Sequence, residues 1–245
     1  MSKTLFAVLA TALAPFCAFA VDGVTLINQS TVMTAGGFPY KIQSSGSYKL
    51  SGNLVVSTAD NAIQINSDDV VLDLNGFKIS GPIVCVGSPP TCTGTSVTGV
   101  AAYNRQNVTV KNGIIRGFKR GIEFAGTATS GGLIADLQSS GNSEYGIFGV
   151  EAVIVRCSAN NNGEFGIGVV NGTVSDSLAN RNKADGFSPF AATLIHNAGN
   201  LNGRYGVGGF GAPFLFGSNV FLNNTTGDVT GGTSQNNNLC TSGTC

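Results

Sequence analysis

The sequence predicts an all-β fold, a single-stranded right-handed parallel β-helix of about eight coils. Three consecutive units of 20 residues between Gly146 and Tyr205 can be laid over one another without a gap. Each unit opens with Gly and an apolar residue, and each carries Asn four residues before the next Gly. Such a unit is too short for a helical hairpin, so it forms one coil of a solenoid. The right hand follows from strand twist and parallel crossovers.

Short β signals elsewhere in the chain extend the same pattern. In the segment 70–74, alternation places Val70, Leu72 and Leu74 on one face of a strand. From residue 99 onward, the Gly-apolar starts lie at 99, 121, 146, 166, 186 and 206. The longest interval, from 121 to 146, contains five extra residues, which we assign to the loop 126–132. Insertions in a solenoid are usually accommodated in such loops.

Four segments are expected along the chain. Residues 1–20 resemble a signal peptide, with Lys3, an apolar run from 5 to 14 and the cleavage pattern Ala-Phe-Ala at 18–20. Export to the periplasm or the extracellular space is therefore predicted. An N-terminal lead-in or cap follows at 21–40. The β-helix is expected at 41–227, with an insertion at 80–98, and a C-terminal polar tail at 228–245.

Composition limits the partners. The 245 residues carry 13 basic and 13 acidic side chains, and only 11% are charged, so no field points toward nucleic acid or an anionic membrane. No second apolar run follows the signal segment, so no membrane span is expected. The oligomeric state is left open by the sequence.

Cysteine spacing predicts two local disulfides in an exported chain. Cys85 and Cys92 bracket one short loop, and Cys240 and Cys245 bracket another. Cys157 is left over and is interpreted as a small buried core residue. Because no Cys/His cluster has zinc spacing, neither a metal nor a cofactor is predicted.

Stacked coils turn sequence positions into ladders. The position four before each Gly predicts a structural amide ladder, in which Asn side chains satisfy turns in neighbouring coils: Asn142, Asn162, Asn182, Asn202 and Asn223. The position just before Gly holds Tyr145, Phe165 and Tyr205, interrupted by Asp185. These rings are candidates for binding sugar rings, and the alternative is ring packing within the stack.

A column of alternating charge is predicted on the outer surface. Aligning the strands by their alternation places six side chains at one outward position: Asp73, Lys111, Asp136, Arg156, Asp176 and His196. The favoured interpretation is an ion-pair ladder that opposes slippage between coils. The alternative is a catalytic group in which Asp176 and His196 are an acid/base pair, with Arg156 and Asp136 beside them.

The Gly-rich coils, the Asn ladder and the stretch NSDDVVLDLNGFKISG resemble the right-handed parallel β-helix superfamily typified by pectate lyases. The stretch GGFPYKIQSSGSYKLSGNLVV resembles secreted bacterial proteins with right-handed β-helix repeats. The resemblance implies the fold and a polysaccharide or cell-surface glycan as partner. Its members include lyases, hydrolases, epimerases, tailspikes and adhesins, so the fold does not choose an activity.

Two functional classes therefore remain. Of the hydrolase signatures of the superfamily, only an Asp-Asp pair is present, at Asp68 and Asp69, where a polar turn explains it. Asp136 and Asp176 are expected two coils apart with Arg156 between them, which does not suit a Ca²⁺ site. A glycan-binding or structural solenoid is favoured over a small carbohydrate-active enzyme such as a polysaccharide lyase, hydrolase or epimerase.

Overall fold

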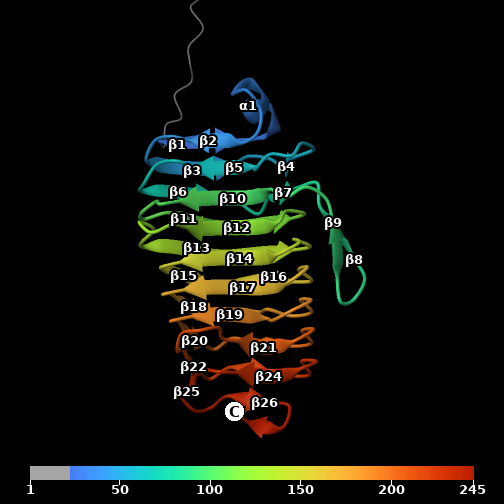
Figure 1. Ribbon diagram of the computed structural model, residues 1–245. Helices are drawn as coiled ribbons and strands as arrows, with labels where there is room; N and C mark the ends of the chain where they lie inside the picture. The colour runs from blue at the N-terminus through green and yellow to red at the C-terminus, as the bar shows by residue number, and fades with distance from the viewer. Residues whose placement is uncertain (1–22) are drawn as a thin grey trace, which may run out of the picture.

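The computed structural model describes residues 23–245, which wind through about ten stacked turns into one elongated body (Figure 1). The chain is all-β apart from one short helix, as predicted, and ten turns are close to the eight expected. The predicted signal peptide, residues 1–20, lies outside the described residues.

Two long parallel sheets run the length of the body. The first sheet contains one strand from each turn, in this order: β1 (Val24–Ile27), β3 (Gly46–Leu50), β6 (Val70–Asp73), β11 (Thr109–Arg116), β13 (Gly132–Ser140), β15 (Ala152–Val155), β18 (Thr173–Ser175), β20 (Thr193–Ile195), β22 (Leu215–Gly217) and β25 (Thr233–Ser234).

The second sheet faces the viewer in Figure 1 and is called the front sheet below. Its strands follow the same order along the body: β2 (Tyr40–Ile42), β5 (Ile63–Ile65), β10 (Thr98–Tyr103), β12 (Arg120–Ala125), β14 (Tyr145–Val150), β17 (Phe165–Val170), β19 (Phe187–Phe190), β21 (Tyr205–Gly208) and β24 (Gly227–Thr230). Short strands form the remaining corner: β4 (Leu54–Val55), β7 (Lys78–Ser80), β16 (Ser158–Asn160) and β23 (Val220–Phe221).

The core consists of side chains stacked between the sheets. Ile147, Ile167, Phe187 and Val207 pair in register from β14 to β21, and each is fully buried. Parallel pairing at a period of 20 residues places the same inward position of each coil directly over the next. This column confirms the apolar stack that the repeat predicted.

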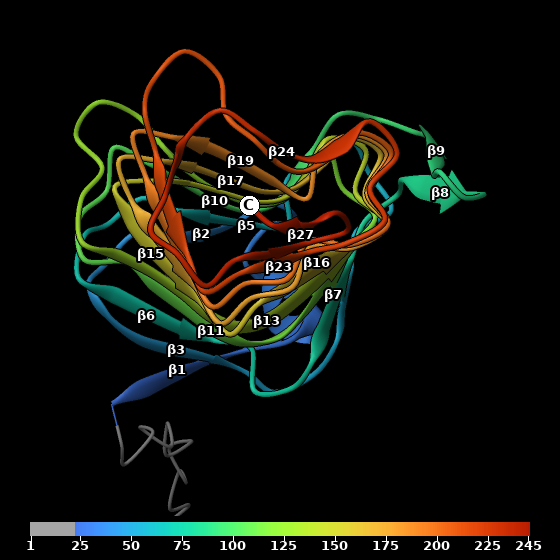
Figure 2. The same cartoon turned by 90° about the horizontal axis from the view of Figure 1, so that it is seen from below.

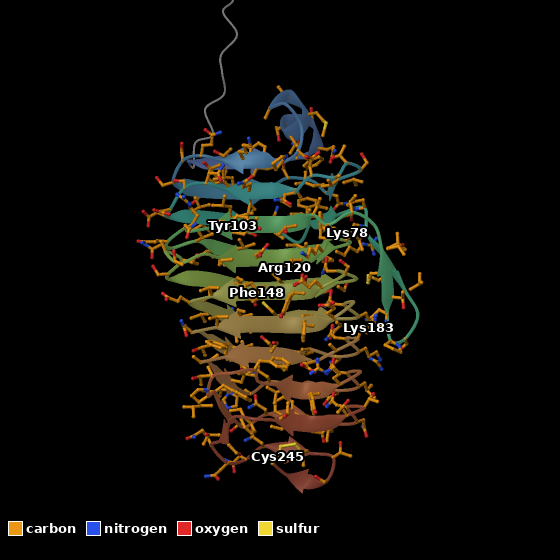
Figure 3. The ribbon with its side chains drawn as sticks, in the orientation of Figure 1. Lys78, Tyr103, Arg120, Phe148, Lys183 and Cys245 are labelled. Atoms are coloured by element: carbon orange, nitrogen blue, oxygen red, sulfur yellow. A yellow bond between two sulfur atoms is a disulfide. The ribbon has the colours of Figure 1, made fainter. Side chains whose placement is uncertain are left out.

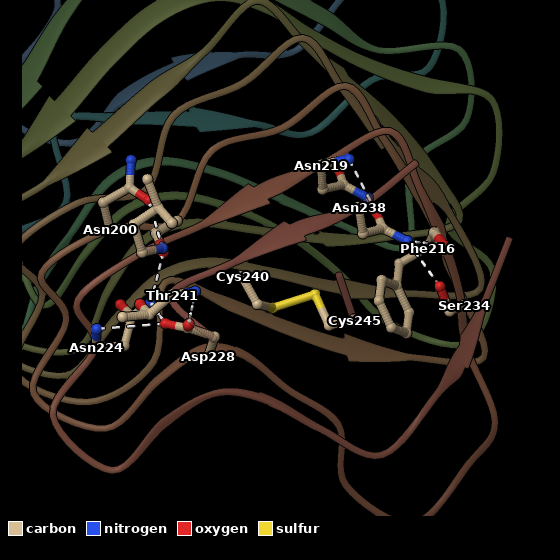
Figure 4. Close-up of a disulfide and its surroundings, with 12 residues drawn as sticks. Asn200, Phe216, Asn219, Asn224, Asp228, Ser234, Asn238, Cys240, Thr241 and Cys245 are labelled. Atoms are coloured by element: carbon tan, nitrogen blue, oxygen red, sulfur yellow. Dashed lines mark hydrogen bonds between the residues drawn. A yellow bond between two sulfur atoms is a disulfide. The ribbon is translucent and has the colours of Figure 1, made fainter. Parts of the chain in front are cut away.

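Both ends of the stack are covered, which protects edges that would otherwise pair with other chains. At the N-terminal end, helix α1 (Gln29–Thr34) is capped by Asn28, whose side chain accepts from the Thr31 amide. At the other end, β26 (Leu239–Cys240) and β27 (Gly243–Thr244) pair next to the Cys240–Cys245 disulfide (Figure 4). Residues 228–245 therefore extend the stack, whereas the sequence suggested a polar tail.

The excursion at 80–98 is an antiparallel hairpin that projects from the side of the body (Figure 2). Its strands are β8 (Val84–Val86) and β9 (Thr91–Thr93), and Cys85 and Cys92 form a disulfide across them.

The predicted amide ladder is continuous from Asn142 to Asn202, but its last member differs. Asn202 donates to the Oδ1 atom of Asn224 from its amide, at 2.9 Å, and from Nδ2, at 3.0 Å. Asn223 lies outside the ladder in a left-handed conformation (φ 58°), and its amide donates to Thr241. Gly227 pairs in register with Tyr205, so Asp228 is the residue opposite Gly206, and the ladder position four residues before it is Asn224.

A second polar ladder follows the other turn of each coil. The amide of Cys157 donates to Ser177, the amide of Ser177 to Asn197, and the amides of Asn197 and Asn219 to the next Asn side chain. The last of these, Asn238, also contacts Ser234 (Figure 4). Cys157 is thus the buried first member of this ladder, and burial raises the pKa of its thiol to about 12.

Candidate functional site

The predicted charge column holds only in part. Lys111 pairs with Ala135, and Asp73 pairs with Lys111, so these two residues stand one position before Asp136 in the coil. Asp73 accepts instead from the side chain of Asn112, at 3.1 Å. The placement of Asp73 and Lys111 in one column with the other four residues is therefore wrong.

The remaining four residues form a real ladder at a turn. Asp136, Arg156, Asp176 and His196 all have positive φ values between 51° and 57°. Arg156 donates to both oxygens of Asp136, at 2.7 and 2.8 Å, which lowers the pKa of that carboxyl. His196 Nδ1 lies 3.6 Å from Asp176 Oδ1. All four side chains are about half exposed, so the ladder has the geometry of surface ion pairs.

The substitution His196→Gln tests the ladder. Because His196 and its partner are exposed, the free energy of unfolding is expected to change by less than about 0.5 kcal/mol, and glycan binding is expected to be retained. Urea unfolding and a glycan-binding assay check both points. Loss of a glycan-cleaving activity in a folded His196→Gln protein would instead identify Asp176 and His196 as an acid/base pair.

The aromatic column lies on the outer face of the front sheet. Tyr145 and Phe165 pair in register, with ring centroids 4.7 Å apart and planes inclined by 19°. Phe148 adds a third ring, 5.3 Å from Tyr145. The Tyr145 ring extends over Gly168, where a Cβ atom would lie 2.6 Å from it, so this glycine makes room for the ring. Tyr205 is separated from these rings by Asp185.

A cluster of charged residues adjoins the three rings. The guanidinium of Arg120 lies 5.4 Å from the Tyr145 ring and 5.1 Å from the Phe148 ring, within cation–π range. Arg120 also contacts Glu123 and lies 2.6 Å from Glu144. Figure 3 shows Arg120 and Phe148 on neighbouring coils of the front sheet, with Tyr103 on the coil above.

The cluster is dense enough to shift several pKa values. The Tyr103 hydroxyl donates to Glu123 at 2.6 Å, and burial together with this carboxylate raises the pKa of Tyr103 to about 12. Burial raises the pKa of Glu144, but hydrogen bonds and charges from Arg120 and Lys119 outweigh it, so the net pKa is lowered. Glu144 is thus held ionised beside the guanidinium of Arg120.

Sequence reasoning missed this cluster, although one signal was present. Arg120 precedes Gly121 as Tyr145 precedes Gly146, so the position before each Gly already placed Arg120 in the aromatic column. Glu123 pairs with Phe148 in the neighbouring outward column, which the strand register reveals.

Asp185 is a buried carboxyl in the aromatic column. Its side chain is fully buried, Oδ1 accepts from the Tyr205 amide at 3.1 Å, and Arg204 Nε lies 3.5 Å from the same oxygen. Oδ2 has no hydrogen-bond partner among the described residues. Gly208 makes room for it, since a Cβ atom there would lie 2.5 Å from Oδ2. Burial raises the pKa of Asp185 and outweighs the hydrogen bond from Tyr205 and the charge of Arg204.

Asp185→Asn is expected to stabilise the protein at pH 7. A raised folded-state pKa means that ionisation opposes folding above that pKa, while the penalty disappears below the ordinary value of 3.8. The melting temperature of the variant should therefore exceed that of the wild type at pH 7 and match it near about pH 3.

Asp228→Asn provides a control of opposite sign. Burial alone would raise the pKa of Asp228, but hydrogen bonds from Thr241 and Asn224 lower it, so its ionised form stabilises the fold above pH 3.8. This variant should melt below the wild type at pH 7. Destabilisation by both variants at pH 7 would contradict a raised pKa for Asp185.

Comparisons with known proteins bear on the fold. No family model and no curated protein sequence matches the chain. Among solved structures, the Dettilon tailspike protein aligns over 80% of this chain and 45% of its own, with 14% identity and a TM-score of 0.53. A mutant of the periplasmic alginate epimerase AlgG aligns over 86% and 53%, with 14% identity and a TM-score of 0.51.

The A-module of the Azotobacter vinelandii mannuronan C-5 epimerase AlgE6 aligns over 86% of this chain and 73% of its own, with 14% identity and a TM-score of 0.50. The chain has the right-handed parallel β-helix fold. It spans about half the length of the first two structures. Sequence identities this low show a shared fold and do not show a shared activity.

A shallow pocket of about 340 Å³ continues the charged cluster along the β-helix. It is lined by Phe165 of the aromatic column, by the cations Lys183 and Arg204, and by Glu164. Arg204 lies over the rings of Tyr205 and Phe210, at 5.7 and 5.5 Å.

No helix within residues 23–245 is long and apolar enough to cross a membrane.

Proposed function

We propose that this protein is a glycan-binding β-helix and that the glycan lies on the outer face of the front sheet. The stacked pair Tyr145 and Phe165, with the Arg120 guanidinium beside it, carries the proposal. Aromatic faces pack against the C–H faces of sugar rings, and neighbouring charged groups hydrogen-bond the hydroxyls that fix orientation. The three rings are half-buried and therefore rigid, which lowers the entropy cost of binding.

Two further observations support this proposal. The solved structures with this fold include a tailspike protein and an alginate epimerase, and the name of the epimerase connects the fold with a polysaccharide. The two disulfides agree with an exported protein, which would meet glycans in the periplasm or outside the cell.

Tyr145→Ala is the test. Loss of the ring removes both its sugar-facing surface and its stack with Phe165, so affinity for the bound glycan should fall about tenfold or more. Purified protein is first tested against uronans and neutral glycans by calorimetry, and the variant is then compared on the tightest ligand. Phe190→Ala, which removes an exposed ring of the same sheet, is the matched control. Equal losses in both variants, or binding to no glycan, would refute the proposal.

A small carbohydrate-active enzyme is the second candidate, and Asp185 favours it. A carboxyl with a raised pKa and an unpartnered oxygen has the properties of a general acid. The glycan panel is therefore also followed for unsaturated ends, new reducing ends and epimerised residues. Turnover that is lost in the folded Asp185→Asn variant would establish the enzymatic alternative.

A further inference from the structure

The β8–β9 hairpin stands off a corner of the body, away from the front sheet (Figure 2). A second cavity lies between residues of this hairpin and residues of that corner. Its volume is about 550 Å³, within the range of about 300 to 1,000 Å³ typical of small-molecule sites. The body contributes the ends of three stacked strands, because Arg116 pairs in register with Ser80 on one side and Ser140 on the other. Asn161 of the following coil completes this wall.

The hairpin is held in place, so the cavity is preformed. The ring of Phe118 is fully buried and packs against Gly81 and Gly99, the points where the excursion leaves and rejoins the body. The Cys85–Cys92 disulfide joins the two hairpin strands. Cys92 Sγ lies 3.8 Å from the Asn142 carbonyl oxygen, so the returning strand touches the body.

The two walls of the cavity differ in chemistry. On the body side, Arg116 has no salt-bridge partner among residues 23–245, although a guanidinium is suited to bidentate binding of a carboxylate. Ser80 Oγ is buried and has no hydrogen-bond partner within the described chain, which is unusual for a buried hydroxyl. The hairpin side presents Ile83 and Pro90, both buried apolar side chains.

We propose that this cavity binds a single sugar acid, with its carboxylate on Arg116. One guanidinium matches one carboxylate, the hydroxyl of Ser80 gains a hydroxyl partner, and the apolar hairpin wall packs against the C–H face of the ring. Ser140 and Asn161 supply further polar contacts on the body side. The site is independent of the front sheet, so it can exist whether or not the proposed glycan site does.

The proposal is tested with sodium glucuronate and the full exported chain. Amide NMR titration should show saturable shifts at Ser80, Arg116 and Ser140, and glucose should bind at least tenfold more weakly because it lacks the carboxylate. Arg116→Gln should weaken glucuronate binding at least tenfold. Arg181→Gln is the control, since Arg181 stands one coil beyond Asn161 at the same corner but outside the cavity.

Two further variants keep the result decisive. Ser80→Ala should also weaken glucuronate binding, while Tyr145→Ala on the front sheet should leave it unchanged. Matching thermal unfolding curves show that each variant remains folded. Absence of saturable glucuronate binding, equal losses in Arg116→Gln and Arg181→Gln, or shifts confined to the front sheet would each overturn the proposal.

Discussion

Phe187→Ala is expected to lower the free energy of unfolding by about 3 to 5 kcal/mol, the usual cost of removing a buried aromatic ring. Phe187 is fully buried on β19 between Ile167 and Val207 of the neighbouring coils. Its ring also meets Phe221 from the opposite corner, with centroids 6.3 Å apart. Stacked coils above and below are fixed by their own hydrogen bonds, so the cavity has little scope to collapse.

Equilibrium urea unfolding, followed by circular dichroism, measures this effect. Phe190→Ala is a closely matched control, because Phe190 ends the same strand and is 43% exposed. Its substitution should cost less than about 1 kcal/mol. Similar urea midpoints for the two variants would mean that the inward face of β19, which carries Phe187, is not packed as described.

The fold could be predicted because period and residue type agree. A Gly-apolar start every 20 residues places Ile147, Ile167 and Phe187 in one inward column. Stacking the parallel strands in any other register would not bring these three apolar side chains together. The amide ladder was equally visible, since Asn tolerates turn conformations and bonds its own equivalent in the next coil. The prediction is wrong only at its last member, Asn223, because Gly227 stands opposite Tyr205 and the ladder continues through Asn224.

The surface columns were harder to predict, and the charge column shows why. Alternation within a strand does not fix its register, and a shift by one residue moves every side chain to the other face. Lys111 and Asp136 were matched by such a shift, whereas the structure pairs Lys111 with Ala135. The left-handed conformation of Asp136 ends the alternation at this turn, and that conformation leaves little trace in the sequence.

The charged cluster forms through contacts between long side chains on neighbouring coils, and these coils differ in length. Arg120 contacts Glu144 across 24 residues and Glu123 within its own strand, so no fixed period marks the three together. In the sequence, Asp185 stands out only as an interruption among aromatic residues. Its burial depends on Gly208 and Arg204 from the next coil, a relation that only the packed structure reveals.

Asn182→Ala is expected to cost about 2 to 4 kcal/mol, more than its small volume suggests. The Oδ1 atom of Asn182 accepts from the amide and from Nδ2 of Asn162, both at 3.0 Å. Its Nδ2 atom donates to the Ala159 carbonyl at 3.0 Å and to Asn202 at 3.1 Å. Alanine would therefore leave the amide of Asn162 and the Ala159 carbonyl without these partners inside a buried turn. Asn162 Nδ2 and Asn202 Oδ1 would each lose one of two bonds, because Nδ2 also donates to the Ser139 carbonyl and Oδ1 also accepts from the backbone amide of residue 182.

The cost should exceed that of a substitution that only trims a loop. Thr127→Ala, in the exposed insertion between β12 and β13, is the comparison, and its effect should stay within about 0.5 kcal/mol. Urea midpoints of both variants measure the difference, and hydrogen exchange should show faster exchange at the Asn162 amide in Asn182→Ala. Equal midpoints for the two variants would mean that the ladder follows the coil geometry without stabilising it. The expected inequality follows from a buried amide that serves both neighbouring coils at once, so its loss cannot be relieved by water on either side.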